Sequence, residues 1–253
     1  MTSISLRLLS VIGAAFVFAA ASSATEPAMI AKARAFVGPE SALNAVKSVH
    51  FVGTLVTADP ADPTKQTRAA VEIFFQTPDR QRIQATSDKT IEVTALDGYE
   101  AWQRIQNSAD PKDWRLTQLN VDQIKRLRAN TWESLGFYRG IERHGGSIED
   151  QGRVTVDGVA CQKIAFIYAP NIIFYRFLDV ATGRLVHTET ESGSTLREQG
   201  EILASGVRFP KTIVTITKNN AGQTQTVTLN FEKVTVNEAM PASLFALPAL
   251  SVR

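Results

Sequence analysis

The segment from Ile172 to Asp179 (IIFYRFLD) predicts a β-strand whose two faces are both apolar. Side chains alternate between the two faces of a strand. The first face carries Ile173, Tyr175 and Phe177, and the second carries Ile172, Phe174, Leu178 and the polar exception, Arg176. A strand with one solvated face alternates apolar and polar residues. Both faces of this strand must therefore be covered by something.

Two further segments have the same property. In VEIFFQ, one face carries Val71, Ile73 and Phe75, while Phe74 projects from the other. In KIAFIY, one face carries Ile164, Phe166 and Tyr168, and the other carries Ala165 and Ile167. The chain therefore has more apolar strand surface than a one-sided sheet can bury.

Strand patterns dominate the chain from His50 onward. Short β-branched or aromatic runs alternate with turn signals, including the tight-hairpin pairs Asp97-Gly98 and Asp157-Gly158. Helical patterns occur at two places only, near residues 28–49 and 120–146, and Asn120 with Gln123 forms a capping-box pattern. The pattern predicts a mainly β (α+β) fold with a single strongly curved antiparallel sheet of about ten or eleven strands and helices against it.

The first 24 residues have the pattern of a secretory signal peptide. Arg7 precedes an apolar run, and small residues lead to Ala24, after which we expect cleavage. We expect residues 25–253 to form one exported domain. The only cysteine, Cys161, lies far from this point, so the sequence predicts no N-terminal lipidation and no intrachain disulfide.

The mature domain is nearly neutral. The chain has 27 Lys and Arg and 25 Asp and Glu, and removal of Arg7 leaves 26 against 25. A protein that binds nucleic acid needs clustered cations to neutralise phosphates. No such run is present in the sequence, so nucleic acid is not an expected partner.

The sequence contains no recognisable catalytic or cofactor motif. His50, His144 and His187 are far apart, and no phosphate-binding glycine loop or serine nucleophile elbow is present. His187, Glu189 and Glu191 alternate along one strand, where a metal site is conceivable, but a solvated polar face is the better explanation. We therefore expect a protein that is not an enzyme, with no cofactor and no metal.

Two interpretations of the doubly apolar strands remain open. Either one face meets the core and a helix or partner covers the other, or the concave face is a cavity for acyl chains with a helical lid. The candidate cavity-wall residues are Val71, Ile73, Phe75, Trp102, Phe166, Tyr168, Tyr175 and Phe177. The candidate lid residues are Ile124, Leu127, Trp132 and Leu135.

The order of motifs resembles the LolA/LolB-like periplasmic lipoprotein carrier superfamily, whose members include outer-membrane lipoprotein-sorting proteins. The similar segments are VKSVHFVGTLV, VEIFFQTPDRQRIQ, LDGYEAW, VDGVACQKIAF, RFLDVATGRLV, ASGVRFPKTI and VNEAMPASLFALP. They extend over nearly all of the mature chain. The resemblance implies an unclosed β-barrel whose hydrophobic concave face is covered by helices.

The sequence departs from that family at one position of interest. Characterised carriers have a basic residue just before the proline of the first hairpin, where this chain has Thr77, and the nearest basic residue is Arg80. The opening and closing mechanism of those carriers is therefore not implied for this chain.

The resemblance implies a soluble, monomeric periplasmic carrier that binds acyl chains of lipoproteins or free lipid, for transport to or maintenance of the outer membrane. Its expected partners are acylated protein or lipid, and an inner- or outer-membrane lipoprotein-handling receptor is a further candidate. The alternative is a non-enzymatic periplasmic sensor or envelope interaction module on the same fold that binds a protein partner.

Overall fold

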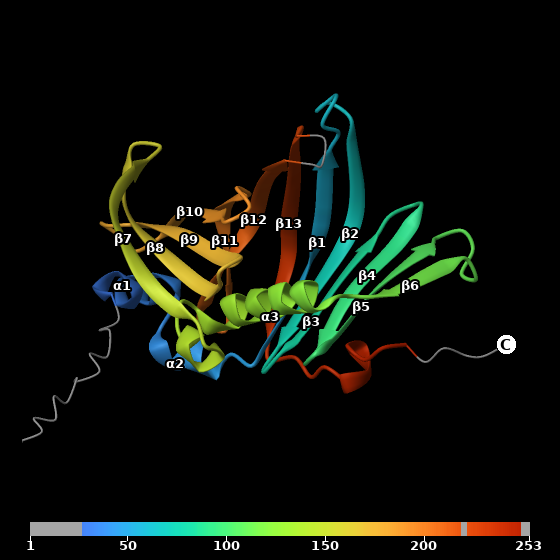
Figure 1. The fold of residues 1–253 in the computed structure, drawn as a ribbon, viewed down its shortest axis with the longest axis horizontal. Helices are drawn as coiled ribbons and strands as arrows, with labels where there is room; N and C mark the ends of the chain where they lie inside the picture. The colour runs from blue at the N-terminus through green and yellow to red at the C-terminus, as the bar shows by residue number, and fades with distance from the viewer. Residues whose placement is uncertain (1–26, 219–221, 249–253) are drawn as a thin grey trace, which may run out of the picture.

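Antiparallel pairing joins all thirteen strands found in the described residues into a single sheet (Figure 1). The computed structural model describes residues 27–218 and 222–248. The strands are β1 Ser48–Ala58, β2 Gln66–Gln76, β3 Arg80–Thr86, β4 Thr90–Asp97, β5 Glu100–Asn107, β6 Trp114–Gln118, β7 Ser147–Val156, β8 Val159–Ala169, β9 Ile172–Asp179, β10 Leu185–Thr190, β11 Thr195–Ala204, β12 Val207–Lys218 and β13 Thr224–Val236. The helices are α1 Ala28–Val37, α2 Glu40–Ala45 and α3 Val121–Gly136, with short 3-10 turns at η1 Ile141–His144 and η2 Ala242–Leu244.

The strand order explains how the sheet is built and why it stays open. The order is β6-β5-β4-β3-β2-β1-β13-β12-β11-β10-β9-β8-β7, so β1 pairs with β13 in the middle and β6 and β7 form the two edges. The β6 and β7 strands are consecutive in the chain, and α3 connects them. Instead of pairing to close a barrel, the two edges are linked by a helix that crosses the open side (Figure 1).

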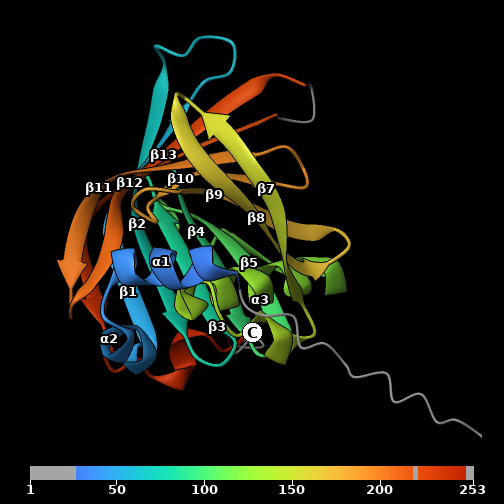
Figure 2. The ribbon, with the colours of Figure 1, turned by 90° about the vertical axis from the view of Figure 1, so that its left-hand side faces the viewer.

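One seam in the sheet is weak. Strands β10 and β11 pair only at Thr188↔Leu196 and Glu189↔Thr195. Helix α1 lies beside the seam, where Lys32 Nζ donates to the carbonyl of Val180 and Arg208 of β12 donates to the carbonyl of Phe36 (Figure 2). The first helix therefore bridges strands that the sheet itself barely connects.

The approach of α1 to the β9–β10 turn is close enough to require a glycine. A Cβ atom on Gly183 would lie 2.5 Å from the carbonyl oxygen of Lys32, and its φ of +84° also favours glycine. The Asp-x-x-Thr-Gly turn in the sequence thus provides the docking surface for α1.

The two faces of the sheet differ in what covers them. We call the face that carries α3 the inner face, and the opposite one the outer face. Gln81 of β3 lies on the inner face, because it contacts Thr131 of α3. On the outer face, Trp102 of β5 donates from Nε1 to the carbonyl of Phe245 at 3.1 Å, so the C-terminal segment covers that part of the sheet.

The observed fold confirms the expected mainly β architecture, a curved antiparallel sheet that does not close into a barrel. The number of strands differs, because about ten or eleven were expected and thirteen are found in the described residues. The edge strand β6 was not anticipated, since its sequence, WRLTQ, is short and polar. The capping box at Asn120 and Gln123 is present at the start of α3. The expected signal peptide lies outside the described residues.

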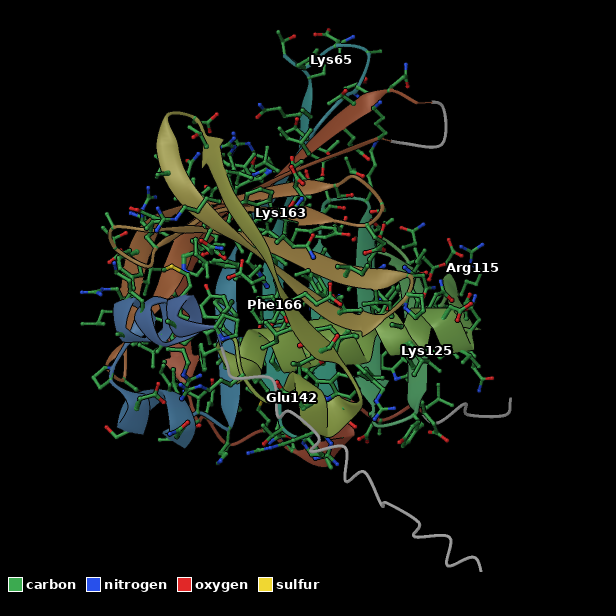
Figure 3. The ribbon with its side chains drawn as sticks, turned by 60° about the vertical axis from the view of Figure 1, so that its left-hand side comes forward. Lys65, Arg115, Lys125, Glu142, Lys163 and Phe166 are labelled. Atoms are coloured by element: carbon green, nitrogen blue, oxygen red, sulfur yellow. The ribbon has the colours of Figure 1, made fainter. Side chains whose placement is uncertain are left out.

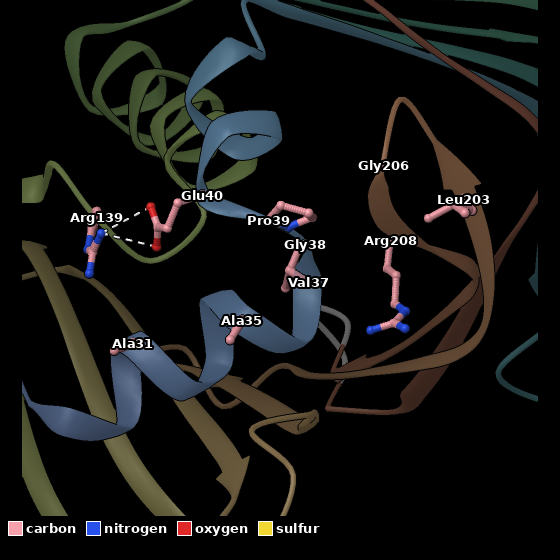
Figure 4. A pocket seen from close by; sticks show the side chains of 10 residues that line it. All are labelled: Ala31, Ala35, Val37, Gly38, Pro39, Glu40, Arg139, Leu203, Gly206 and Arg208. Atoms are coloured by element: carbon pink, nitrogen blue, oxygen red, sulfur yellow. Dashed lines mark hydrogen bonds and ion pairs between the residues drawn. The ribbon is translucent and has the colours of Figure 1, made fainter.

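A buried arginine holds the helices together. Arg34 of α1 is 2 % exposed, and its guanidinium donates to both carboxylate oxygens of Glu40 at 2.8 and 2.7 Å. It also donates to the carbonyls of Gly136 and Phe137 at the end of α3, at 3.1 and 2.7 Å. Arg139 contacts the same Glu40 carboxylate from the surface (Figure 4). Arg34 therefore caps α3 and ties it to α1 and α2.

We expect Arg34→Met to lower the free energy of unfolding by about 3 kcal/mol or more, because it leaves two helix-end carbonyls without their donor and leaves Arg139 as the remaining cation at the Glu40 carboxylate. Urea denaturation followed by circular dichroism measures this change. Lys125→Met, which removes an exposed pair with Asp122, is the control and should cost less than about 1 kcal/mol. Equal losses in the two variants would contradict the role of Arg34.

Candidate functional site

An apolar area on the inner face is the first element of the candidate site. Its centre is formed by Val71 and Ile73 of β2 and Phe231 of β13, all buried. Half-buried aliphatic side chains surround them. We call this set the inner apolar patch, and it consists of Leu55, Val71, Ile73, Ile83, Ile213, Leu229 and Phe231. Phe75 packs against the same cluster, so three of the expected wall residues meet here.

A second apolar cluster lies on the inner face of the β8–β9 hairpin, but it is filled by other parts of the chain. Phe166 is 1 % exposed and packs with Ile30 and Ala33 of α1 and with Ile141 of η1. Tyr168 lies at the margin of this cluster, and its ring is 5.8 Å from that of Trp132. Phe166 is therefore core beneath α1, and Tyr168 faces α3.

Three expected wall residues lie on the outer face, which corrects the expectation of one common wall. Tyr175 and Phe177 of β9 pair with Ala165 and Lys163 of β8, while Phe166 pairs with Phe174. The Nζ atom of Lys163 lies 4.5 Å from the ring of Tyr175 and 5.2 Å from the ring of Phe177. Figure 3 labels Lys163 and Phe166 on this hairpin.

Trp102 is also on the outer face, beneath the C-terminal segment, in a cluster with Val93 and Ala95. The alternation in sequence showed that these strands are apolar on both sides. It did not show which side turns inward, because that depends on register and on the bulges between β8, β9 and β10.

The four expected lid residues are all on α3, and of these Leu135 packs into a core cluster of the sheet, with Val49 of β1 and Phe209 of β12. Ile124 and Leu127 are half-buried nearer the start of the helix. The fully buried residues of α3 are Ala129 and Thr131, and Thr131 Oγ1 lies 3.3 Å from Oε1 of Gln81. The residues that α3 buries completely are therefore small or polar, and Leu135 adds an apolar contact near the end of the helix.

Trp132 stacks against polar rings and cations instead of packing into the apolar patch. Its ring is 3.8 Å from the ring of His144 at an interplanar angle of 8°, and the guanidinium carbon of Arg128 lies 4.8 Å from the centroid of the Trp132 ring. Burial lowers the pKa of His144, with a weaker opposing effect from Asp79. The stack therefore favours a neutral imidazole beside Trp132.

Polar contacts hold α3 to both wings of the sheet. On the β1–β6 side, Asp79 in the β2–β3 turn accepts hydrogen bonds from Arg128 at 3.0 Å and from Trp132 Nε1 at 2.5 Å. On the β7–β13 side, Glu133 accepts from Tyr168 at 2.8 Å and from Arg176 at 2.6 Å. These carboxylates fix the position of the helix.

A third contact holds the first half of α3. Arg126 pairs with Glu191 at the end of β10 and donates to the carbonyl of Asn171 at 2.9 Å. In the first hairpin, the residue that binds α3 is an acid, Asp79, two positions after Thr77. The cation of that contact, Arg128, is on the helix.

A cavity of about 540 Å³ opens at the start of α3. Its wall is formed by Thr94 and Gln103 on the inner faces of β4 and β5, by Gln123 and Leu127 of α3, and by Ile172 at the start of β9. Its volume is within the range of small-ligand sites. Helix α3 therefore leaves space between itself and the sheet, and Leu127 is the expected lid residue that lines it.

A group of charged side chains interrupts the apolar inner face. Arg176 lies on this face of β9, since it pairs with Ile164, and Glu198 lies on it in β11, since it pairs with Ile213. Burial disfavours the charge of Arg176, but Glu133, Tyr138 and Glu198 together outweigh this and hold its pKa above the usual value. Burial raises the pKa of Glu198, and the attraction of Arg176 only partly opposes this.

The same surroundings affect two tyrosines. Burial raises the pKa of Tyr138, and burial together with Glu133 raises the pKa of Tyr168. Both hydroxyls therefore stay protonated and can donate. Of this group, the sequence indicated only Arg176, as the polar exception in an apolar strand; Glu198 is one of several polar residues in its strand and carried no signal.

The expected absence of metal and catalytic chemistry remains a prediction. Within residues 27–218 and 222–248, no group of three His, Cys, Asp or Glu side chains is arranged to hold a metal ion. His187 contacts Glu189 at 3.3 Å, but Glu191 binds Arg126 instead. Burial raises the pKa of the Cys161 thiol, which disfavours the reactive thiolate.

We expect Asp79→Ala to loosen α3, because it removes the acceptor of both Arg128 and Trp132. Hydrogen exchange of α3 amides should become about tenfold faster or more, while exchange in β12 and β13 stays unchanged. Asp88→Ala, in an exposed turn, is the control. Unchanged exchange in α3 would show that Asp79 does not hold the helix.

The raised pKa of Glu198 predicts how stability depends on pH. The folded state binds this proton more tightly than the unfolded state, whose ordinary value is near 4.5. The contribution of Glu198 to the free energy of unfolding is therefore present at low pH and is lost as pH rises from that value through the folded pKa. The charged groups near it are Arg176 and Glu133, and the neutral Tyr138 hydroxyl shares the same surroundings.

We expect Glu198→Gln to remove this loss, so that the variant gains stability relative to the wild type as pH rises through that window. Urea denaturation at a series of pH values measures the difference. Glu232→Gln, at an exposed position of β13, should show no such trend. A constant difference between Glu198→Gln and wild type across the window would refute the assignment.

Comparison with known proteins supports the fold and goes no further. No protein-family model and no curated protein sequence matches the chain. Among solved structures, a LolA superfamily protein from Nitrosomonas europaea is similar, with a TM-score of 0.55 at 11 % identity, covering 87 % of this chain and 96 % of that one. A DUF1329 family protein from Desulfovibrio piger has a TM-score of 0.54 at 9 % identity, with coverages of 88 % and 98 %.

A third similar structure is a putative outer membrane lipoprotein-sorting protein domain from Vibrio parahaemolyticus, with a TM-score of 0.54 at 10 % identity. It covers 85 % of this chain and 94 % of that one. These likenesses extend over nearly the whole described chain in each case. Together with the open thirteen-stranded sheet and its crossing helix, they show that this chain has the LolA-like fold.

Proposed function

We propose that this protein is an exported carrier that binds the acyl chain of a lipid or lipoprotein between the inner face of its sheet and α3. The observation that carries the proposal is the inner apolar patch, in which Leu55, Ile83, Ile213 and Leu229 remain half-buried. Aliphatic side chains that face the interior of an open sheet, without being fully covered, match the chemistry of an acyl chain. The LolA-like fold supports the same proposal.

The polar contact between α3 and the sheet also supports a carrier. The residues that helix α3 buries completely are Ala129 and Thr131, ion pairs with Asp79 and Arg176 hold the helix at its margins, and a cavity remains between its first half and the sheet. Burial of each methylene group of a ligand contributes about 0.8 kcal/mol. A chain in contact with the patch therefore gains affinity without any bond being made or broken.

In this proposal the protein acts in the periplasm, because residues 1–24 have the pattern of a secretory signal peptide. None of the helices in the described part of the chain is long and apolar enough to cross a membrane. The partner in this proposal is acylated protein or free lipid.

A pair of variants on one strand tests the proposal. Ile213 and Ile216 both lie on β12, but Ile213 belongs to the inner apolar patch and Ile216 is 39 % exposed on the outer face. We expect Ile213→Asp to weaken binding of a fluorescent fatty-acid probe by about tenfold or more, because it places a charge against the acyl chain. Ile216→Asp should change the affinity by less than about twofold.

Circular dichroism must show that both variants are folded. Equal affinity in the two variants, or failure of the wild-type protein to take up the probe at all, would contradict the carrier proposal. A wild-type protein that binds no probe would instead favour the alternative interaction module that binds a protein partner.

A further inference from the structure

Arg176 on the inner face of β9 has hydrogen-bonding capacity that the protein does not use. Its Nη2 donates to Glu133 at 2.6 Å and its Nη1 donates to Thr188 at 3.1 Å. Its Nε is buried and has no partner in the described part of the chain. The side chain is 15 % exposed and that of Glu133 is 6 % exposed. The charge of Arg176 is thus compensated by Glu133, while its Nε–H has no hydrogen-bond partner among the described residues.

Glu198 is a second carboxylate close to Arg176, and it does not form a pair with it. Strand β11 places it on the inner face, directly opposite Ile213 of the inner apolar patch. Its interaction with Arg176 is electrostatic, and no hydrogen bond to its carboxyl group is found among the described residues. A carboxyl group at this place costs free energy unless a polar group forms a hydrogen bond with it. The described residues do not supply such a partner.

A cavity of about 270 Å³ lies at the weak seam of the sheet, between β10 and β11, which pair at only two positions. Tyr138, Leu185, Glu198 and Phe209 line it, and its other charged lining residues are Arg184, Glu201 and Arg208. Arg176 does not line this cavity. The ring of Tyr138 lies 6.0 Å from the guanidinium carbon of Arg176. We call this space the seam cavity.

The charges around the seam cavity select the kind of group that fits. Most of the charges near the cavity are compensated within the protein, since Arg208 pairs with Glu201, Arg184 lies near Asp179 and Arg176 pairs with Glu133. Glu198 has no ion-pair partner among the described residues, so an anionic group bound beside it would be repelled. A cationic group would be attracted by Glu198 but opposed by Arg184 and Arg176. An uncharged group that both donates and accepts hydrogen bonds can contact the Tyr138 hydroxyl and the Glu198 carboxyl without either penalty.

We propose that Glu198 and Tyr138, beside Arg176, bind the uncharged, hydrogen-bonding end of an amphiphile whose acyl chain lies on the inner apolar patch. The proposal rests on the carrier function and names the class of its ligand. The polar end is a hydroxyl, an ester or an amide, as in a glyceride or an acylated peptide. The adjacency of Glu198 and Ile213 in the β11–β12 pairing places the polar end next to the start of the acyl chain.

The test compares ligands that share one acyl chain and differ in their polar ends. Displacement of the uncharged dye N-phenyl-1-naphthylamine from the purified mature protein is measured with oleate, 1-oleoylglycerol and N-oleoylglycinamide, at about pH 8, where oleate is ionised. We expect the uncharged ligands to bind about tenfold more tightly than oleate. The glyceride and the amide distinguish a lipid source from an acylated-peptide source, and preference for either one over oleate supports the proposal.

Glu198→Gln then tests the cause of the preference. It removes the charge and keeps the shape, so oleate should gain about fivefold or more in affinity, while the uncharged ligands change by less than about twofold. Glu232→Gln, the same substitution at an exposed position, should leave all three affinities unchanged.

The outcomes separate this proposal from the carrier function. Oleate binding as tightly as the uncharged ligands, or a preference that Glu198→Gln does not reduce, would overturn the proposed class of ligand while acyl binding stands. Failure of the dye and of all three ligands to bind would instead overturn the carrier function itself.

Discussion

The open edges of the sheet are the constraint on which the rest of this structure depends. Strands β6 and β7 follow each other in the chain and lie at opposite edges of the sheet, so α3 must cross the inner face to connect them. Arg34 fixes the end of that helix by donating to its last carbonyls, and ion pairs with Asp79 on one wing and with Arg176 on the other fix its sides. The helix position is therefore determined by connectivity and polar contacts, and the inner apolar patch is left partly uncovered.

This division of roles has an energetic consequence. Partly buried ion pairs contribute modestly to stability, because desolvation offsets much of their attraction, whereas apolar burial grows with the area removed from water. A helix that docked through large apolar side chains would fill the space above the sheet. Because α3 instead buries Ala129 and Thr131, part of the inner apolar patch stays uncovered. In the proposed carrier, burial of this area by the ligand would supply the free energy of binding.

The sequence predicts the architecture well, because alternation, turn pairs and the capping box at Asn120 are local signals. It predicts the site only in part. Alternation separates the two faces within β8 and within β9, but the sequence placed Phe166 and Tyr175 in one wall, and only the pairing of Phe166 with Phe174 shows that they lie on opposite faces of the hairpin. Trp102 illustrates this limit, since the segment that covers it, around Phe245, is more than a hundred residues away. The apolar members Val71, Ile73 and Phe75 were placed together, since one strand carries all three.

The polar group on the inner face could be only half recognised from sequence, and the reason is physical. Arg176 stands out because its neighbours along β9 are apolar, and a lone cation there needs a buried partner. Glu198 is one of several polar residues in β11, and only the pairing of β11 with β12 places it opposite Ile213 and on the side of Arg176. Two carboxylates then share one guanidinium, and only Glu133 bonds to it. If the proposed ligand binds here, the acid that the arginine leaves unpaired is the group that would disfavour an anionic end, because Glu133 already compensates the charge of Arg176.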